Sequence, residues 1–222
     1  MEEILEVIVI RKRIKNMYLH ITREGRVQVT APLRMPDQTI WEFVEKKKDW
    51  IEKSLAKVPE MVHYDYVPGE MHYVYGCPAP LKLYRSQRNG GTLEAGSISL
   101  FLHSARTDRK KLYEQVAGES LLATISVMVR KWAPKMGVTP GNIKIRRVKS
   151  RWGSCNVKTH ELTFSLDLFT KPRDLIESVV VHELNHLLEP GHGPRFHALM
   201  AHWLPDYKER SKKLNSFPRE FV

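Results

Sequence analysis

The alternation of apolar and polar residues changes character several times along the chain. Residues 4–30 alternate with a period of two and are rich in β-branched side chains. This predicts three strands, over 4–10, 18–22 and 26–32, with a turn at Glu24-Gly25 between the last two. From Asp37 to about residue 58 the apolar residues recur at helical spacing, which predicts one helix.

The pattern then returns to strands before a long helix. Residues 59–105 contain short apolar runs separated by proline and glycine, and the "RNGG" segment at 88–91 predicts a hairpin turn. A stripe of apolar residues predicts a helix over about 108–132. Pro134 and Gly137 are expected to end it.

The last third of the chain predicts a smaller sheet and further helices. Two strands are expected at 143–148 and 161–169, and Pro172 opens a helix. We therefore expect an α+β protein. A mostly β part with one helix covers residues 1–105, and a helical α+β part covers 106–222. The alternative is that both parts share one core and form one continuous domain.

Composition narrows the cellular setting. Cys77 and Cys155 are too few for a disulfide scaffold and suit a reducing cytosol. Residues 1–13 lack the basic start and small-residue cleavage site of a signal peptide, and no apolar run approaches the length of a membrane span. We expect a cytoplasmic protein that does not enter the membrane.

The charge raises the question of an anionic partner. The chain of 222 residues carries 36 Lys and Arg against 25 Asp and Glu, a net charge of +11. A basic surface is the electrostatic footprint of nucleic-acid binding, but it also aids solubility. The basic residues are scattered and no nucleic-acid-binding motif is present. Nucleic acid is therefore an alternative partner, and the sequence does not indicate the oligomeric state.

Four histidines gather in "VVVHELNHLLEPGHGPRFH" at 179–197. His182, Glu183 and His186 form the arrangement H-E-x-x-H, which places both imidazoles on one face of a helix. In this motif the histidines hold Zn²⁺, and the glutamate takes a proton from the water that the metal activates. Nickel, cobalt and manganese also bind such sites in vitro, but imidazole ligands favour zinc, at one ion per chain.

A catalytic zinc requires a third protein ligand from another direction. His192 follows a Pro-Gly pair at 190–191 that should end the helix and turn the chain back. His197, His202 and Glu189 are the alternative ligands.

The competing interpretation of the motif is ordinary helix packing. It is disfavoured because Glu183 and two histidines would be costly to bury in so apolar a segment without partners. A metal ion supplies that partner.

Three segments together resemble the YgjP-like metallopeptidase family: "SRWGSC" at 150–155, the following strand "LTFSLDL", and "VVVHELNHLLEPGHGPRF". The resemblance implies a zincin-like fold, with the active-site helix beside a sheet, and metal-dependent hydrolase or peptidase activity. By position, His182, His186 and His192 match the family's metal ligands, and Glu183 matches its catalytic residue.

The chain departs from the family pattern at three positions. Gly191 and Gly193 flank His192 where the family has an N-H-S segment, and His197 stands where the family has Trp. None of these departures removes a residue that matches the family's metal ligands, so the departures affect the pocket wall and the hold on His192.

The segment before the histidine helix offers further candidates. Arg151 could stabilise an oxyanion or bind a substrate carboxylate, whereas Trp152 and Gly153 more simply pack a turn. A nucleophilic Cys155 is disfavoured because the nearby histidines are assigned to the metal. The strand at 161–168 is a candidate sheet edge for a peptide.

These residues predict a zinc-dependent hydrolase, most simply a metallopeptidase, with Glu183 as general base and a peptide or protein as substrate. Two alternatives stay open at this point. One is a basic nucleic-acid-associated binding protein with a structural zinc, and the other is a metal-dependent hydrolase of a non-peptide substrate.

Overall fold

A computed structural model describes residues 7–22, 25–56, 64–94, 96–148 and 150–217. The chain divides into two compact units, Met1–Met61 and Val62–Val222. Among the described residues, no helix is both long and apolar enough to cross a membrane.

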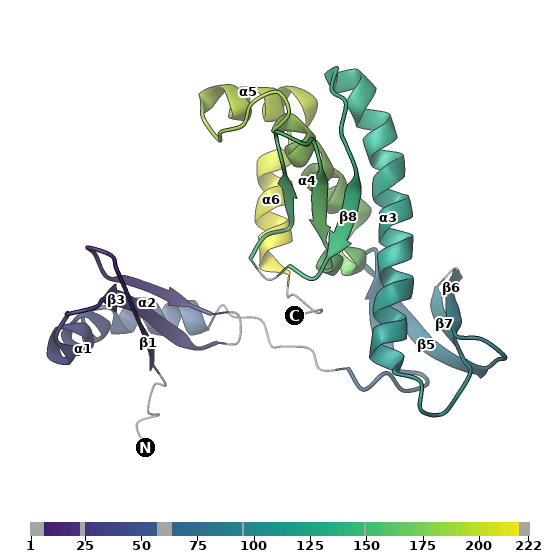
Figure 1. Ribbon diagram of the computed structural model, residues 1–222, viewed down its shortest axis with the longest axis horizontal. Coiled ribbons are helices and arrows are strands. Elements are labelled where there is room, and N and C mark those ends of the chain that lie inside the picture. Colours follow the sequence, from purple (N-terminus) through teal and green to yellow (C-terminus); the bar gives the residue numbers. More distant parts are fainter. Residues whose placement is uncertain (1–6, 23–24, 57–63, 95, 149, 218–222) are drawn as a thin grey trace. The chain divides into compact units, whose positions relative to one another are not determined.

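The first unit contains a small sheet and two short helices (Figure 1). Its elements are β1 (Val7–Lys12), β2 (Tyr18–Ile21), β3 (Val27–Pro32), α1 (Asp37–Glu45) and α2 (Lys48–Leu55). Strand β3 is central, parallel to β1 and antiparallel to β2. The expected single helix is two helices, because the backbone of Lys47 (φ −108°, ψ 7°) leaves helical geometry. Glu24 of the expected turn and residues 57–58 lie outside the described residues.

The second unit begins with a four-stranded sheet of order β4-β5-β7-β6. The strands are β4 (Met71–Val74), β5 (Cys77–Arg85), β6 (Gly90–Glu94) and β7 (Ser97–Leu102). The prediction of a hairpin turn at 88–91 is wrong, because β7 lies between β5 and β6 and pairs with both. Gly91 serves close packing instead: a Cβ there would lie 2.7 Å from Val116 Cγ2.

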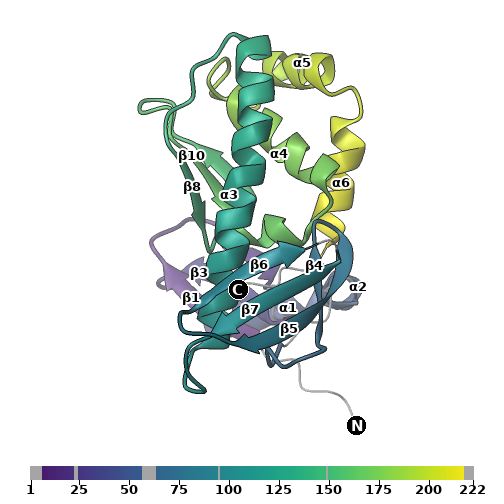
Figure 2. The ribbon, with the colours of Figure 1, turned by 90° about the vertical axis from the view of Figure 1, so that its right-hand side faces the viewer.

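A long helix, α3 (Arg109–Met136), covers one face of this sheet (Figure 2). Asp108 caps its first turn by accepting a hydrogen bond from the backbone N–H of Lys111 (2.9 Å). The helix extends beyond the predicted end, because Pro134 is accommodated in its last turns. It ends at Gly137, whose φ of 67° is the left-handed conformation typical of glycine after a helix.

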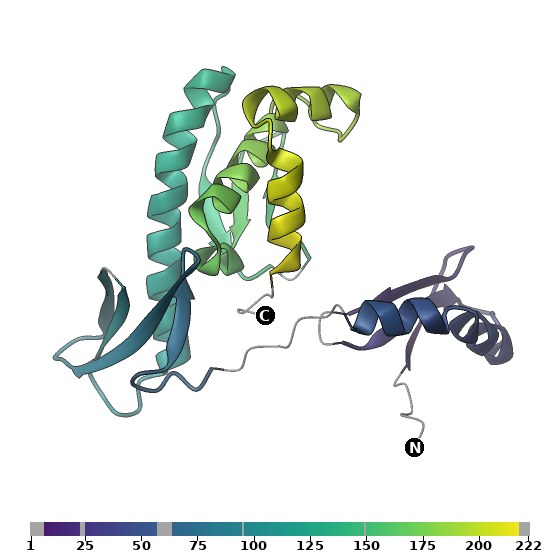
Figure 3. The ribbon, with the colours of Figure 1, turned by 180° about the vertical axis from the view of Figure 1, so that it is seen from behind.

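The other side of α3 meets the second sheet and the remaining helices. The elements are β8 (Ile143–Arg146), β9 (Gly153–Cys155), β10 (Leu162–Ser165), η1 (Leu166–Thr170), α4 (Arg173–Asn185), α5 (Pro194–Trp203) and α6 (Tyr207–Ser216). Helix α4 lies between α3 and α6 (Figure 3). The predicted strand over 161–169 ends at Ser165, after which the chain turns into the buried η1.

The two sheets of the second unit share one hydrophobic core, which includes Leu81 and Leu100 of the first sheet and Phe164 of the second. The turn between β4 and β5 contacts the start of α4, because a Cβ on Gly76 would lie 2.7 Å from Pro172 Cγ. The backbone N–H of Tyr75 also donates to the carbonyl of Phe169 (2.8 Å). These contacts place β4 to β7 with the C-terminal elements, whereas the hydrophobic pattern predicted a boundary near residue 105. The α+β class is confirmed.

Candidate metal centre

The histidine motif lies at the end of α4, a largely buried helix. Helix α4 is surrounded by α3, α5, α6 and β9, which explains why its sequence is apolar on nearly every face. His182 and Glu183 are in its last turn, and His186 immediately follows it. All three side chains line a pocket of about 630 Å³.

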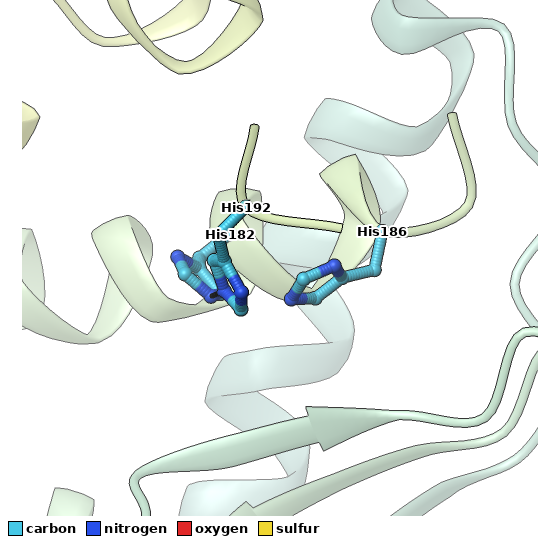
Figure 4. A group of neighbouring side chains, drawn as sticks. All are labelled: His182, His186 and His192. Atoms are coloured by element: carbon cyan, nitrogen blue, oxygen red, sulfur yellow. Dashed lines mark hydrogen bonds between the residues drawn. The ribbon is translucent and has the colours of Figure 1, made fainter. Parts of the chain in front are cut away.

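His192 reaches the same place from the loop between α4 and α5, as the sequence predicted. Figure 4 shows the imidazoles of His182, His186 and His192 facing one another. One ring nitrogen of each lies within 4.8 Å of those of the other two. The Nε2 atoms of His182 and His192 are 3.1 Å apart. Two nitrogens bound to a tetrahedral zinc lie about 3.3 Å apart, given a Zn–N distance of about 2.05 Å. The donor set therefore fits zinc.

The protonation of the imidazoles suits ligation. Burial, together with the neighbouring His186, His192 and His197, lowers the pKa of His182 to about 4. Burial also lowers the pKa of His186. The Nδ1 of His186 donates to the carbonyl of Glu189 (3.3 Å), which fixes the tautomer and leaves Nε2 as the ligand atom.

The aromatic ring of Phe196, on helix α5, packs against all three imidazoles. The ring centroid of Phe196 lies 4.9 Å from that of His182, 4.8 Å from that of His186 and 4.7 Å from that of His192. The fully buried side-chain amide of Asn185 donates to the carbonyl of Phe196 (3.2 Å), which ties α4 to α5. Phe196 thus restricts the rotation of all three candidate ligands.

Glu183 is buried beside the histidines and packs against β9. Its side chain is 4 % exposed, and its Oε2 has no hydrogen-bond partner among the described residues. A Cβ on Gly153 would lie only 2.6 Å from Glu183 Oε1, so the glycine of the "RWGSC" segment leaves room for this carboxyl group. Burial raises the pKa of Glu183 to about 8, and the charge of Arg151 partly opposes that rise. A buried carboxyl group with an unsatisfied oxygen is suited to a cation or a reacting proton nearby.

The alternative ligands are engaged elsewhere. Nδ1 of His197 lies 3.1 Å from the hydroxyl of Tyr207, and the two rings stack. The ring of His202 packs on Trp203, at 4.6 Å between centroids. The carboxylate of Glu189 forms an ion pair with Arg195 (3.7 Å).

Sequence reasoning missed the contribution of α6 to the pocket. Tyr207, Ser211, Leu214 and Asn215 line it from one face of the helix. Asn215 Oδ1 accepts a hydrogen bond from Trp152 Nε1 (3.0 Å), which joins α6 to the segment before β9. The spacing of these four positions is that of one helical face and was visible in the sequence. Nothing local indicated that this face meets the histidines.

The segment at 151–155, which contains the edge strand β9, lines the pocket. Arg151 and Cys155 both line the pocket. The strand expected at the edge, β10, is central, and the edge strands of the β8-β10-β9 sheet are β8 and β9. Burial, and then the nearby Glu183, raise the pKa of the Cys155 thiol to about 11. This disfavours a thiolate nucleophile.

No curated protein matches the chain. A partly similar solved structure is the metallopeptidase zymogen jannalysin of Methanocaldococcus jannaschii. It has 21 % identity and a TM-score of 0.37, over 40 % of this chain and 92 % of that one. The family model of the YgjP-like metallopeptidase domain matches residues 15–217, which include both units and all three histidines. The chain therefore belongs to the YgjP-like metallopeptidase family, and its members are metal-dependent hydrolases.

Proposed function

We propose that the chain is a zinc-dependent peptidase in which His182, His186 and His192 hold one zinc ion and Glu183 is the general base. One observation carries the proposal. Three imidazoles converge within 4.8 Å at a pocket that also holds the buried carboxyl group of Glu183. No fourth His, Cys, Asp or Glu joins this group among the described residues, which favours a catalytic over a closed structural site.

Zinc at these histidines supplies Lewis acidity, which acidifies water and polarises a substrate carbonyl. The residues of the chain supply the proton transfers. Glu183 accepts a proton from the attacking water and passes it to the leaving amine. Its position one residue after His182 points its carboxyl group at the same pocket, between the histidines and β9. Arg151, whose charge already acts on Glu183, is placed to stabilise negative charge on the substrate.

The edge strand at the pocket supports an extended peptide as substrate. Strand β9 is one edge of its sheet and lines the pocket, so a peptide can pair with its backbone as an additional strand. Leu214, Val157 and Met200 give the pocket apolar walls for side chains. Tyr207 brings a hydroxyl group into the same pocket and is a second candidate for stabilising an oxyanion. The cytoplasmic location stays a prediction.

The test is the substitution Glu183→Gln, which keeps the size of the side chain and removes the base. Zinc content should stay near one per chain, because the ligands are untouched. Cleavage of quenched-fluorescent peptides from a mixed library should fall by about 10²–10⁴-fold. Glu189→Gln is the matched control on the neighbouring turn and should retain activity. Parental activity in the Glu183→Gln protein with zinc bound would refute the role of Glu183.

A further inference from the structure

A second hollow lies far along α3 from the histidines, where β5 and β7 end. It has a volume of about 720 Å³, and its lining includes Tyr84, Arg85, His103 and Arg109. None of its lining residues is acidic. The loops that follow the two strands are held together here. The side-chain oxygen of Asn89 accepts hydrogen bonds from the backbone N–H of His103 (2.8 Å) and the hydroxyl of Thr107 (3.1 Å).

The positive charge around this hollow is not neutralised by the protein. Residues 82–111 contain seven lysines and arginines against two acidic residues, Glu94 and Asp108. Arg85, Arg88 and Arg106 are exposed and have no carboxylate partner among the described residues. By contrast, other cations of the second unit, such as Lys131 and Arg210, are paired with carboxylates.

The charge does not serve the stability of α3 either. The first turn of α3 carries Arg109, Lys110 and Lys111 and no acidic residue. Cations are unfavourable at the amino end of a helix because the helix dipole is positive there. Asp108 caps the helix, and Arg109 donates to the carbonyl of Tyr66 (3.3 Å), but the three side chains still add net positive charge beside the hollow. A polyanion is the ligand that such a field would attract.

Aromatic side chains lie close to these cations, because Tyr84 and Arg85 both line the hollow. In β5, Ala79 and Leu81 are buried in the hydrophobic core, so Pro80, Lys82 and Tyr84 point to the other face. Tyr84 is 47 % exposed and is paired in register with Phe101 of β7. The two rings are stacked, with 5.8 Å between centroids. Figure 2 shows this face of the sheet with no described element of the second unit over it.

We propose that this sheet face and hollow bind single-stranded nucleic acid. The phosphates lie against Arg85, His103 and Arg109, and a base stacks on Tyr84, whose ring Phe101 supports. Arginines that follow a backbone beside exposed aromatic rings on a sheet are the two elements of single-strand recognition. A duplex would hide the faces of its bases, and an acidic peptide would have no use for the flat aromatic surface. The proposal does not depend on the metal centre.

The test measures the fluorescence anisotropy of labelled mixed-sequence 20-nucleotide DNA and RNA strands with the full chain. We expect binding at low salt that weakens as salt rises. Tyr84→Ala should weaken binding at least about fivefold through loss of stacking, while Tyr84→Phe should bind like the parent. Arg85→Gln should reduce the slope of log Kd against log salt by about 0.7, for one phosphate. Arg130→Gln, an exposed site at the other end of α3, is the charge control.

Three results would overturn the proposal. The first is no binding of either strand by the parent protein at low salt. The second is equal binding of duplex and single strands with no effect of Tyr84→Ala, which would mean only non-specific attraction. The third is displacement of the strand by polyglutamate at equal charge concentration, which would assign the surface to an acidic peptide. Circular dichroism of each variant checks that a loss of binding is not a loss of folding.

Discussion

Substitution of Gly153 by alanine tests the catalytic assignment through a single methyl group. The three atoms nearest to the added Cβ all belong to Glu183: Oε1 at 2.6 Å, Cγ at 2.8 Å and Cδ at 2.9 Å. Non-bonded carbon contacts are comfortable at about 3.5 Å, so the carboxyl group must move by roughly 0.5–1 Å. A displacement of about 1 Å in a reacting group costs on the order of 100-fold in rate. We therefore expect kcat/KM to fall about 10- to 100-fold in Gly153→Ala.

The assay pairs peptide hydrolysis with zinc analysis of the same sample. Zinc should stay near one per chain in Gly153→Ala, because none of the three nearest atoms belongs to a histidine. Gly191→Ala is the matched control: it adds a methyl group next to His192, and nothing lies within 4 Å of that position. It should keep both zinc and activity. Parental kcat/KM in Gly153→Ala, with zinc bound and the fold intact, would show that the carboxyl group of Glu183 is not positioned for catalysis.

Three further substitutions separate metal binding from turnover. His182→Ala or His186→Ala should reduce the zinc content measured by elemental analysis and lower the melting temperature, because one metal ligand is removed and the remaining ligands are left buried. Zinc at the parental level would mean that the ligands are misassigned. Tyr207→Phe removes only the hydroxyl group near His197. The Tyr207→Phe protein should keep its zinc content and its KM. If the hydroxyl group stabilises an oxyanion, kcat should fall about tenfold or more. An unchanged kcat would remove Tyr207 from the mechanism.

The metal centre was the most predictable part of the molecule because its information is local. His182 and His186 are one helical turn apart, and His192 follows closely in the sequence. The expectation that Pro190-Gly191 ends the helix is wrong, because α4 already ends at Asn185, but the loop that follows still brings His192 to the same point. The apolar sequence of α4 also indicated its burial correctly. The role of Gly153 was not visible, because it depends on contact between β9 and a side chain 30 positions later.

Features that depend on long-range contacts were not predictable from hydrophobic patterns. The "RNGG" segment has the composition of a hairpin turn, yet β7 inserts between the strands it connects. Gly91 is needed there for contact with Val116 of α3, not for a turn. In the same way, the contact of Gly76 with Pro172 joins the first sheet of the second unit to α4. Each of these glycines is visible in the sequence, but the side chain that packs against it could not be predicted.

The carboxylate of Glu177, on α4, carries a last prediction that the sequence did not suggest. It accepts hydrogen bonds from Lys131 Nζ (2.6 Å), Trp132 Nε1 (2.9 Å) and Arg210 (3.3 Å), and so joins α3 and α6 to the helix that bears the histidines. Burial alone would raise the pKa of Glu177, but these hydrogen bonds outweigh it and hold the pKa below its ordinary 4.5. The folded state therefore favours the charged form. This stabilisation is complete above pH 4.5 and is lost as the pH falls through the lower pKa of the folded state.

Glu177→Gln should lower the free energy of unfolding by about 1–3 kcal/mol at pH 7, and by less at pH 4 and below. Urea unfolding with EDTA present at both pH values excludes any effect of metal loss. The exposed Glu119→Gln is the control and should change little. An equal effect of Glu177→Gln at pH 7 and in acid would show that the charge of this residue does not hold the three helices together.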